Sequence, residues 1–307
     1  RETRTTASAK TVREVLQNRL IHELLNPCCP EGECLALVLD KHGASVLASI
    51  AKMSDVMFPE GTVAIVQNLE RKREPSPLME AVYFVEPTLA NIDLIKVDFP
   101  ARRTRPNMYY GVHILFTSRA PANVVEHLKG SERLLQHLLT VADANLDAVA
   151  LEPKAFHFGM PKAMPQLYSK SMNQRQRLDV QQLVVDRLVG LCLSLHEYPL
   201  IRFRTENTTT QGIATKLQEK MNRHMADDKD FWYHGMERES AMERGTLILV
   251  DRREDLVAPL MHEVTVQAMA FDVLEIDEAR SVFSYVYDNG TAKETKDMYL
   301  NNEKNEV

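Results

Sequence analysis

The sequence predicts an α/β protein built from two parallel-sheet units. Short, continuous apolar runs alternate with segments whose apolar residues recur every three or four positions, which is typical of buried parallel strands joined by covering helices. The chain has 307 residues, about the length of two domains. Its 11 glycines are about half the usual share, and this disfavours turn-rich β-sandwiches and glycine-rich phosphate loops.

The first unit begins with a helix and continues with strands. Apolar residues from Val12 to Leu24 keep helical spacing up to Asn26-Pro27, where we expect the helix to end. Continuous apolar runs then predict buried strands, with helices between most of them, at Leu35–Leu39, Thr62–Val66, Ala81–Val85 and Val112–Phe116. Residues 1–147 are therefore predicted to form an α/β domain with a parallel sheet and right-handed crossovers.

The second unit follows a connector, from Glu152 to Arg175, that is rich in Pro, Met, Lys and Gln. A long helix covers Val180 to Leu195, and Tyr198-Pro199 stops it before an apolar strand. The remaining predicted elements are a strand at Leu200–Phe203, a helix over Ile213–Met221, a solvated loop at Asp227–Asp230, a buried strand at Thr246–Val250, a helix from Pro259 to Leu274, an exposed strand at Ser281–Tyr287 and a hairpin turn at Asn289-Gly290.

Charge, cysteines and hydropathy narrow the function classes. The 43 acidic and 37 basic side chains give a net charge of −6, which argues against nucleic acid as a general partner. Cys28, Cys29 and Cys34 crowd one loop, and their spacing suits neither a disulfide framework nor a tetrahedral zinc site. No apolar run approaches the length that spans a bilayer. We therefore expect a cytoplasmic protein with no metal, no cofactor and no membrane anchor of its own.

One polar cluster at the end of a predicted strand has two interpretations. P-loop, dinucleotide, zinc-protease and nucleophile-elbow motifs are absent from the sequence. Asp251, Asp255, His262 and Glu263 could instead serve a metal-dependent α/β hydrolase, because such proteins place their sites at the carboxyl ends of strands. In the architectural interpretation, which we favour, Asp251 caps the following turn, Arg252 bridges to Asp255, and His262-Glu263 belong to an ordinary helix start.

A basic run in the first unit also has two interpretations. Arg71-Lys72-Arg73 precedes Glu74-Pro75 and is predicted to lie on a loop. Such a run is either solvated surface or a docking site for an acidic partner. In the docking interpretation, Lys52 and Asp55 would lie at the same end of the sheet as Arg71.

Four stretches of the sequence resemble the Sec/Munc family of syntaxin-binding proteins. Residues 247–274 (LILVDRREDLVAPLMHEVTVQAMAFDVL) match its signature at many fixed positions. Residues 37–57 (LVLDKHGASVLASIAKMSDVM) and 70–88 (ERKREPSPLMEAVYFVEPT) resemble the syntaxin-clasping domain of the plasma-membrane branch. Residues 191–204 (LCLSLHEYPLIRFR) resemble its second domain.

The resemblance implies an arch of three domains and a role in membrane fusion. The expected boundaries are 1–147 for the clasping α/β domain, 148–250 for half of the second α/β domain, and 251–307 for the start of a mainly helical third domain. A family chain is nearly twice this length, so the sequence looks like a fragment. The implied function is non-enzymatic control of SNARE assembly. The implied partner is a syntaxin-type SNARE or the assembled SNARE complex. Recruitment to the plasma membrane or to secretory vesicles would be indirect, through the SNARE. A scaffold subunit of a tethering complex stays an alternative.

The resemblance also assigns roles to individual residues. Lys52 matches a basic position that contacts syntaxin, and Arg71 with Lys72 matches a basic loop that does the same. Ser45 and Gln67 replace charged contacts of relatives, so part of the charged interface is expected to be lost or altered. The full set of expected partner contacts, in which the two valines mark an outer pocket for a syntaxin N-terminal peptide, is Lys52, Asp55, Arg71, Lys72, Arg73, Val125 and Val141. The signature residues Asp251, Arg252, Asp255, His262 and Glu263 are expected to hold domains together.

Overall fold

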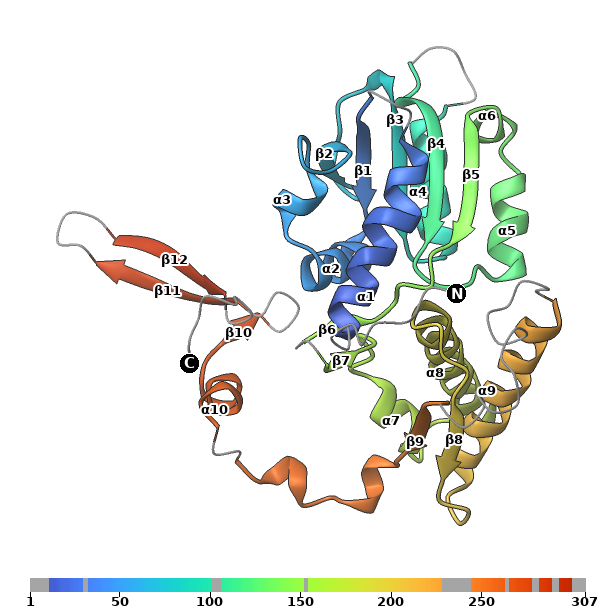
Figure 1. Ribbon diagram of the computed structural model, residues 1–307, viewed down its shortest axis with the longest axis vertical. Helices are drawn as coiled ribbons and strands as arrows, with labels where there is room; N and C mark the ends of the chain where they lie inside the picture. The colour runs from blue at the N-terminus through green and yellow to red at the C-terminus, as the bar shows by residue number, and fades with distance from the viewer. Residues whose placement is uncertain are drawn as a thin grey trace, which may run out of the picture.

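The computed structural model describes residues 11–29, 33–100, 106–151, 154–227, 244–262, 265–277, 282–288 and 293–299. A five-stranded, all-parallel sheet organises the first half of the chain (Figure 1). Its strands, in the spatial order β2-β1-β3-β4-β5, are β1 (Leu35–Leu39), β2 (Val63–Asn68), β3 (Ser76–Val85), β4 (Tyr109–Phe116) and β5 (Leu138–Asp143). The mixed α/β class and the four predicted strands are confirmed, and β5 is an additional strand that the sequence pattern did not reveal.

Helices cover both faces of this sheet because each buried strand has two apolar faces. Leu35, Leu37 and Leu39 of β1 face one core, and the alternating Ala36 and Val38 face the other. The first core is covered by α1 (Val12–Asn18), a π-helical continuation over Arg19–Leu25, and α2 (Lys41–Ile50); the second is covered by α4 (Leu89–Asp98) and α5 (Ala122–Lys129). Figure 1 shows α1 crossing the near face of the sheet.

A topological switch point follows from this arrangement. Helix α2 follows β1 and α4 follows β3, and although β1 and β3 are neighbours, the two helices lie on opposite faces of the sheet. Asp40 starts α2 by accepting a hydrogen bond from the Gly43 N–H at 2.7 Å, and Thr88 caps α4 in the same way. Crevices outside the carboxyl ends of strands at such a point are where open α/β sheets hold ligands. Two one-turn helices, α3 (Met53–Val56) and α6 (Glu132–Leu135), complete this half.

The second half is built around a pair of long helices. Helices α8 (Gln174–Ser194) and α9 (Thr208–Asp227) share a third core that includes Val185, Leu217 and Met221. Strands β8 (Leu200–Phe203) and β9 (Thr246–Leu249) pair in parallel, and β6 (Val149–Ala150) pairs antiparallel with β7 (Phe156–His157) ahead of α7 (Ala163–Tyr168). The prediction of a buried strand at Thr246–Val250 was wrong about burial: Ile248 is 65% exposed, because β9 has β8 as its only partner among the described residues.

The last described segment differs from the sequence prediction. A single helix from Pro259 to Leu274 does not form; a 3₁₀ turn at Ala258–Leu260 is followed by extended backbone at Met261, and α10 (Val266–Val273) begins only after Thr265. Leu260 and Met261 are exposed, and a helix whose apolar side chains pack on nothing gains little stability from propensity alone.

An antiparallel hairpin follows α10 and projects away from the five-stranded sheet (Figure 1). It joins β11 (Val282–Asp288) to β12 (Lys293–Tyr299), with the short β10 (Ile276–Asp277) beside β11. The predicted hairpin is confirmed, and its turn residues Asn289 and Gly290 lie outside the described residues. Among the helices of the described ranges, none has both the length and the apolar character to cross a membrane.

Candidate functional site

A groove of about 590 Å³ runs along β2, the strand at the open edge of the sheet. Ala44 of α2 and Gln67 of β2 line it, and Arg71, Lys72 and Arg73 of the following loop form its basic rim. We call this hollow the β2-edge groove. An edge strand presents unpaired backbone groups, so such an edge is a natural place for a partner to dock.

The basic rim is set by the turn that ends β2. Asn68 accepts a hydrogen bond from the Glu70 N–H at 2.8 Å through its side chain, and its carbonyl accepts one from the Arg71 N–H at 3.3 Å. This turn leaves the Arg71 and Lys72 side chains exposed to solvent. Within the described residues neither of them forms an ion pair, so both charges are available to an acidic partner.

Arg73 lies inward and anchors the loop. Its Nη2 is 2.8 Å from Asp98 Oδ2, and the two side chains are only 6% and 4% exposed. Tyr83 donates a hydrogen bond to the same carboxylate at 2.6 Å, and Arg73 also donates to Tyr109. Burial raises the pKa of Asp98, while the hydrogen bonds from Tyr83 and Arg73 oppose this shift. This geometry favours a positioning role for Arg73, whose predicted partner contact stays a prediction.

Lys52 and Asp55 flank the other end of β2. Lys52 is exposed at the start of α3, and Asp55 accepts a hydrogen bond from Gln17 at 2.9 Å. Met57 bridges to Val63, the first residue of β2, whereas Arg71 follows the last residue. The expectation that Lys52 and Asp55 share an end of the sheet with Arg71 is therefore wrong. The reason is that α2 carries the chain back to the amino end of the sheet before β2 begins.

Val125 and Val141 lie at the opposite edge of the sheet from the β2-edge groove. Val125 is half-buried on α5, and Val141 is exposed on β5, where it pairs with Ile114 of β4. A pocket that used these two valines would therefore be separate from the groove. Their assignment to such a pocket stays a prediction.

The signature segment forms a compact network of polar contacts after β9. Asp251 is buried and accepts hydrogen bonds from the Arg253 N–H at 2.9 Å and from Asn207 at 2.7 Å, and Arg253 Nη2 lies 2.9 Å away. Burial opposes ionisation, but these hydrogen bonds prevail and hold the pKa of Asp251 well below its usual range. Arg252 donates to the backbone carbonyl of Asp255 at 2.6 Å. The segment ties β9 to the start of α9.

The described members of the hydrolase set do not share a site. Asp251 is neutralised by Arg253, and Asp255 is exposed and accepts backbone hydrogen bonds. His262 is exposed and lies 3.0 Å from Asp272, and Glu263 lies outside the described residues. The geometry therefore gives the hydrolase alternative no support.

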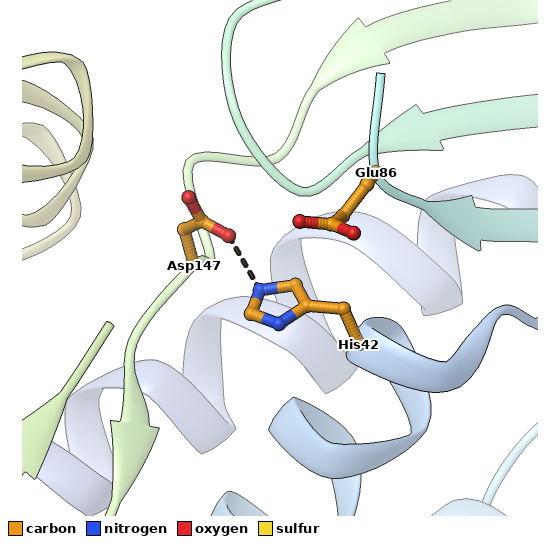
Figure 2. Close-up of side chains that lie close together, drawn as sticks. All are labelled: His42, Glu86 and Asp147. Atoms are coloured by element: carbon orange, nitrogen blue, oxygen red, sulfur yellow. Dashed lines mark hydrogen bonds and ion pairs between the residues drawn. The ribbon is translucent and has the colours of Figure 1, made fainter. Parts of the chain in front are cut away.

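The structure reveals a cluster at the switch point that the sequence pattern did not predict (Figure 2). His42 Nε2 lies 2.5 Å from Asp147 Oδ1, and Arg187 Nε lies 2.7 Å from the other oxygen of the same carboxylate. Arg187 Nη2 is 3.3 Å from Glu86, and the guanidinium also donates to the Phe158 carbonyl. We call these four side chains the His42 cluster. The available sequence signal was polar residues close after buried strands: Glu86 directly follows β3, and His42 is the third residue after β1.

The His42 cluster borders a cavity of about 750 Å³. Lys41, Ser45 and His157 add polar groups to its wall, and Val149, Met160 and Pro161 add apolar ones. His42, Glu86 and Asp147 present ligand atoms within 4.8 Å of one another, close enough to share a metal ion. Arg187 already pairs with both carboxylates, however, so a metal ion would have to compete with a buried guanidinium for the same oxygens. We therefore assign no metal to these residues.

Comparisons with known proteins find similar sequences and structures along most of the chain. The Sec1 family model matches residues 36–307. The chain is 32% identical over 295 residues to the protein transport protein sec1 of Dictyostelium discoideum, covering 95% of this chain and 47% of that protein. It is 26% identical to the SNARE-interacting protein KEULE of Arabidopsis thaliana, with 95% and 44% covered. The chain thus spans about half the length of the curated relatives it matches.

Solved structures show the same fold. The Unc18 chain in the Unc18–syntaxin 1 complex of Monosiga brevicollis matches with a TM-score of 0.75 and 26% identity, over 95% of this chain and 48% of that one. Sly1p, solved with an N-terminal peptide of Sed5p, matches with a TM-score of 0.72 over 94% of this chain and 48% of that one. At 21% identity the second match concerns the fold alone.

Proposed function

Because the chain belongs to the Sec1 family, we propose that it is a non-enzymatic regulator of SNARE assembly that binds a syntaxin-type SNARE. Relatives in this family carry the descriptions "protein transport" and "SNARE-interacting", and the similar Unc18 structure was solved with syntaxin 1. The β2-edge groove is the proposed contact surface. The observation that carries this proposal is a set of exposed basic side chains at both ends of an edge strand, which form no ion pair within the described ranges: Lys52 at one end, and Arg71 with Lys72 at the other.

The charge distribution suits an elongated acidic partner. The chain carries a net charge of −6, so these basic groups are a local exception on an acidic protein. Six residues of strand separate the two basic ends, which is a span of roughly 20 Å at about 3.3 Å per residue. A helix of about 13 residues covers that distance. The side of a helical bundle with acidic residues about four turns apart would therefore meet both ends at once.

The proposed mechanism is a shift in the partner's conformational population. A protein that binds one state of a helical bundle more tightly than its other states stabilises that state by the difference in binding free energy. The exposed basic groups would set association rate and partner choice, while apolar contacts in the groove would set residence time. Binding of this kind would place a cytoplasmic protein at a membrane peripherally, through the SNARE.

Isothermal titration calorimetry tests the proposal. The cytosolic region of a syntaxin-type SNARE is titrated into the wild-type chain and into the Lys52→Glu/Arg71→Glu double variant. We expect the double variant to bind about tenfold more weakly, equivalent to about 1.4 kcal/mol, with a smaller dependence on salt. The matched control is the double variant Lys96→Glu/Lys170→Glu, which changes the net charge equally on α4 and after α7, away from the groove. Equal affinities for all three proteins would refute the assignment of the groove.

A further inference from the structure

The His42 cluster joins four separate parts of the chain. His42 comes from the first turn of α2, Glu86 from the residue after β3, Asp147 from the segment after β5, and Arg187 from the middle of α8. The side chains of His42 and Asp147 are 13% and 3% exposed. Arg187 is 8% exposed, whereas Glu86 is 35% exposed, so the cluster fastens α2 and α8 to the carboxyl edge of the sheet through mostly buried ionic contacts.

The charges balance only when His42 carries a proton. Arg187 and a protonated His42 then face the carboxylates of Asp147 and Glu86, giving no net charge, whereas a neutral imidazole leaves one negative charge uncompensated. An uncompensated charge in such a protected site is costly. Burial alone would lower the pKa of His42, but Asp147 and Glu86 outweigh both burial and Arg187 and raise it.

The other charged and titratable groups near His42 are already committed elsewhere or exposed. Asp40 accepts hydrogen bonds from the Gly43 and Glu86 N–H groups and from Asn91. His157, which also lines the cavity, accepts a hydrogen bond from the Gly159 N–H, and Lys41 is exposed. Asp147 is therefore the group that responds most directly to the proton on His42.

We propose that His42 is a positioning residue for the β2-edge groove, because its proton fixes the turn of α2 that carries Ala44, a wall residue of that groove. Ala44 follows His42 by two residues, and the next residue, Ser45, lines the cavity beside His42. Loss of the proton weakens the bond to Asp147 and loosens this turn, which then keeps the Asp40 cap alone at its start. Partner affinity therefore falls as the pH rises. This inference rests on the proposed function of the groove.

We call the bond between protonated His42 and Asp147 the proton latch. Two measurements on the full chain in EDTA test this latch itself. First, an NMR titration of the wild-type protein should give His42 a pKa above its ordinary value of 6.5. Second, the free energy of unfolding is compared between wild type and His42→Gln from pH 6 to 8.5. A raised folded-state pKa makes the wild-type protein more stable to unfolding than His42→Gln. This difference in unfolding free energy is complete below about pH 6.5 and is lost as pH rises through the pKa of His42. His224, whose pKa is lowered by burial, contributes with the opposite sign and cancels in this difference.

A third measurement links the latch to the groove. Calorimetry with the cytosolic region of a syntaxin-type SNARE should show the wild-type affinity falling by about threefold between pH 6.5 and 8.5, and the affinity of His42→Gln should change much less. Parallel pH profiles for the two proteins would overturn the positioning role. A His42 pKa at or below 6.5, or Zn²⁺ binding that His42→Gln abolishes, would overturn the latch. Absence of binding at every pH would refute the proposed function and its link to His42, while the first two measurements still decide the latch.

Discussion

Removal of the Asp98 carboxylate is expected to destabilise the first half of the chain strongly. Asp98→Ala leaves the Arg73 guanidinium buried without its counter-charge, and it takes away the acceptor of the Tyr83 hydroxyl, which is fully buried. Breaking a buried ion pair by removing one partner costs about 3–5 kcal/mol, because the remaining charge stays desolvated. Both side chains are more than nine-tenths buried, so the upper part of this range applies.

Chemical unfolding by urea measures this cost, and two further variants separate its causes. The double variant Arg73→Met/Asp98→Leu should recover most of the loss, because it removes both charges together. The matched control Glu23→Ala breaks an exposed pair with Arg19, where Glu23 is 51% exposed, and should cost about 0.5 kcal/mol or less. A loss below about 1 kcal/mol for Asp98→Ala would refute the view that the pair anchors the basic loop.

Three further predictions concern single positions. Gly43→Ala should destabilise the chain by about 1–3 kcal/mol in urea unfolding, because a Cβ there would clash with the Phe84 carbonyl oxygen. An unfolding midpoint equal to that of wild type would contradict the close packing of α2 on β3. Cys28 and Cys192, whose burial raises each pKa to about 11, should react with a thiol reagent at pH 7 only as fast as the chain unfolds, and rapid labelling of either one would refute their burial. Asp251→Asn should lower the free energy of unfolding by about 1–3 kcal/mol at pH 7. Because hydrogen bonds lower the pKa of Asp251 from 3.8, this difference should shrink as pH falls through the folded-state pKa. A difference independent of pH would contradict the charge-assisted bonds.

The sheet could be predicted from the sequence wherever a strand is buried on both faces. The apolar run of β1 was predicted at its observed bounds, because Leu35–Leu39 meets a core on each side. Strand β5 escaped prediction because it lies at an edge: Leu139 and Val141 are exposed, and the run is interrupted by polar residues. The other edge strand, β2, was predicted because its apolar run from Val63 to Val66 is continuous. An edge strand is therefore found from the local pattern only where that run is uninterrupted.

The site could be predicted only in part, for a similar reason. The basic loop is contiguous in sequence, so Arg71 and Lys72 could be found directly, but the inward turn of Arg73 depends on Asp98, 25 residues further on. The His42 cluster depends on separations of more than 100 residues, between His42 and Asp147 and between Glu86 and Arg187. Pairings over such distances come from the topology of the sheet, and no local pattern encodes them.

Hydrogen–deuterium exchange of the wild-type chain, with and without the cytosolic region of a syntaxin-type SNARE, tests the proposed groove most directly. We expect binding to slow exchange in α3, β2 and the basic loop through Arg73, with or without added protection at the predicted peptide pocket of α5 and β5, while α4 changes little. Protection confined to α5 and β5, with β2 and its loop unchanged, would contradict the assignment of the β2-edge groove as the principal contact surface.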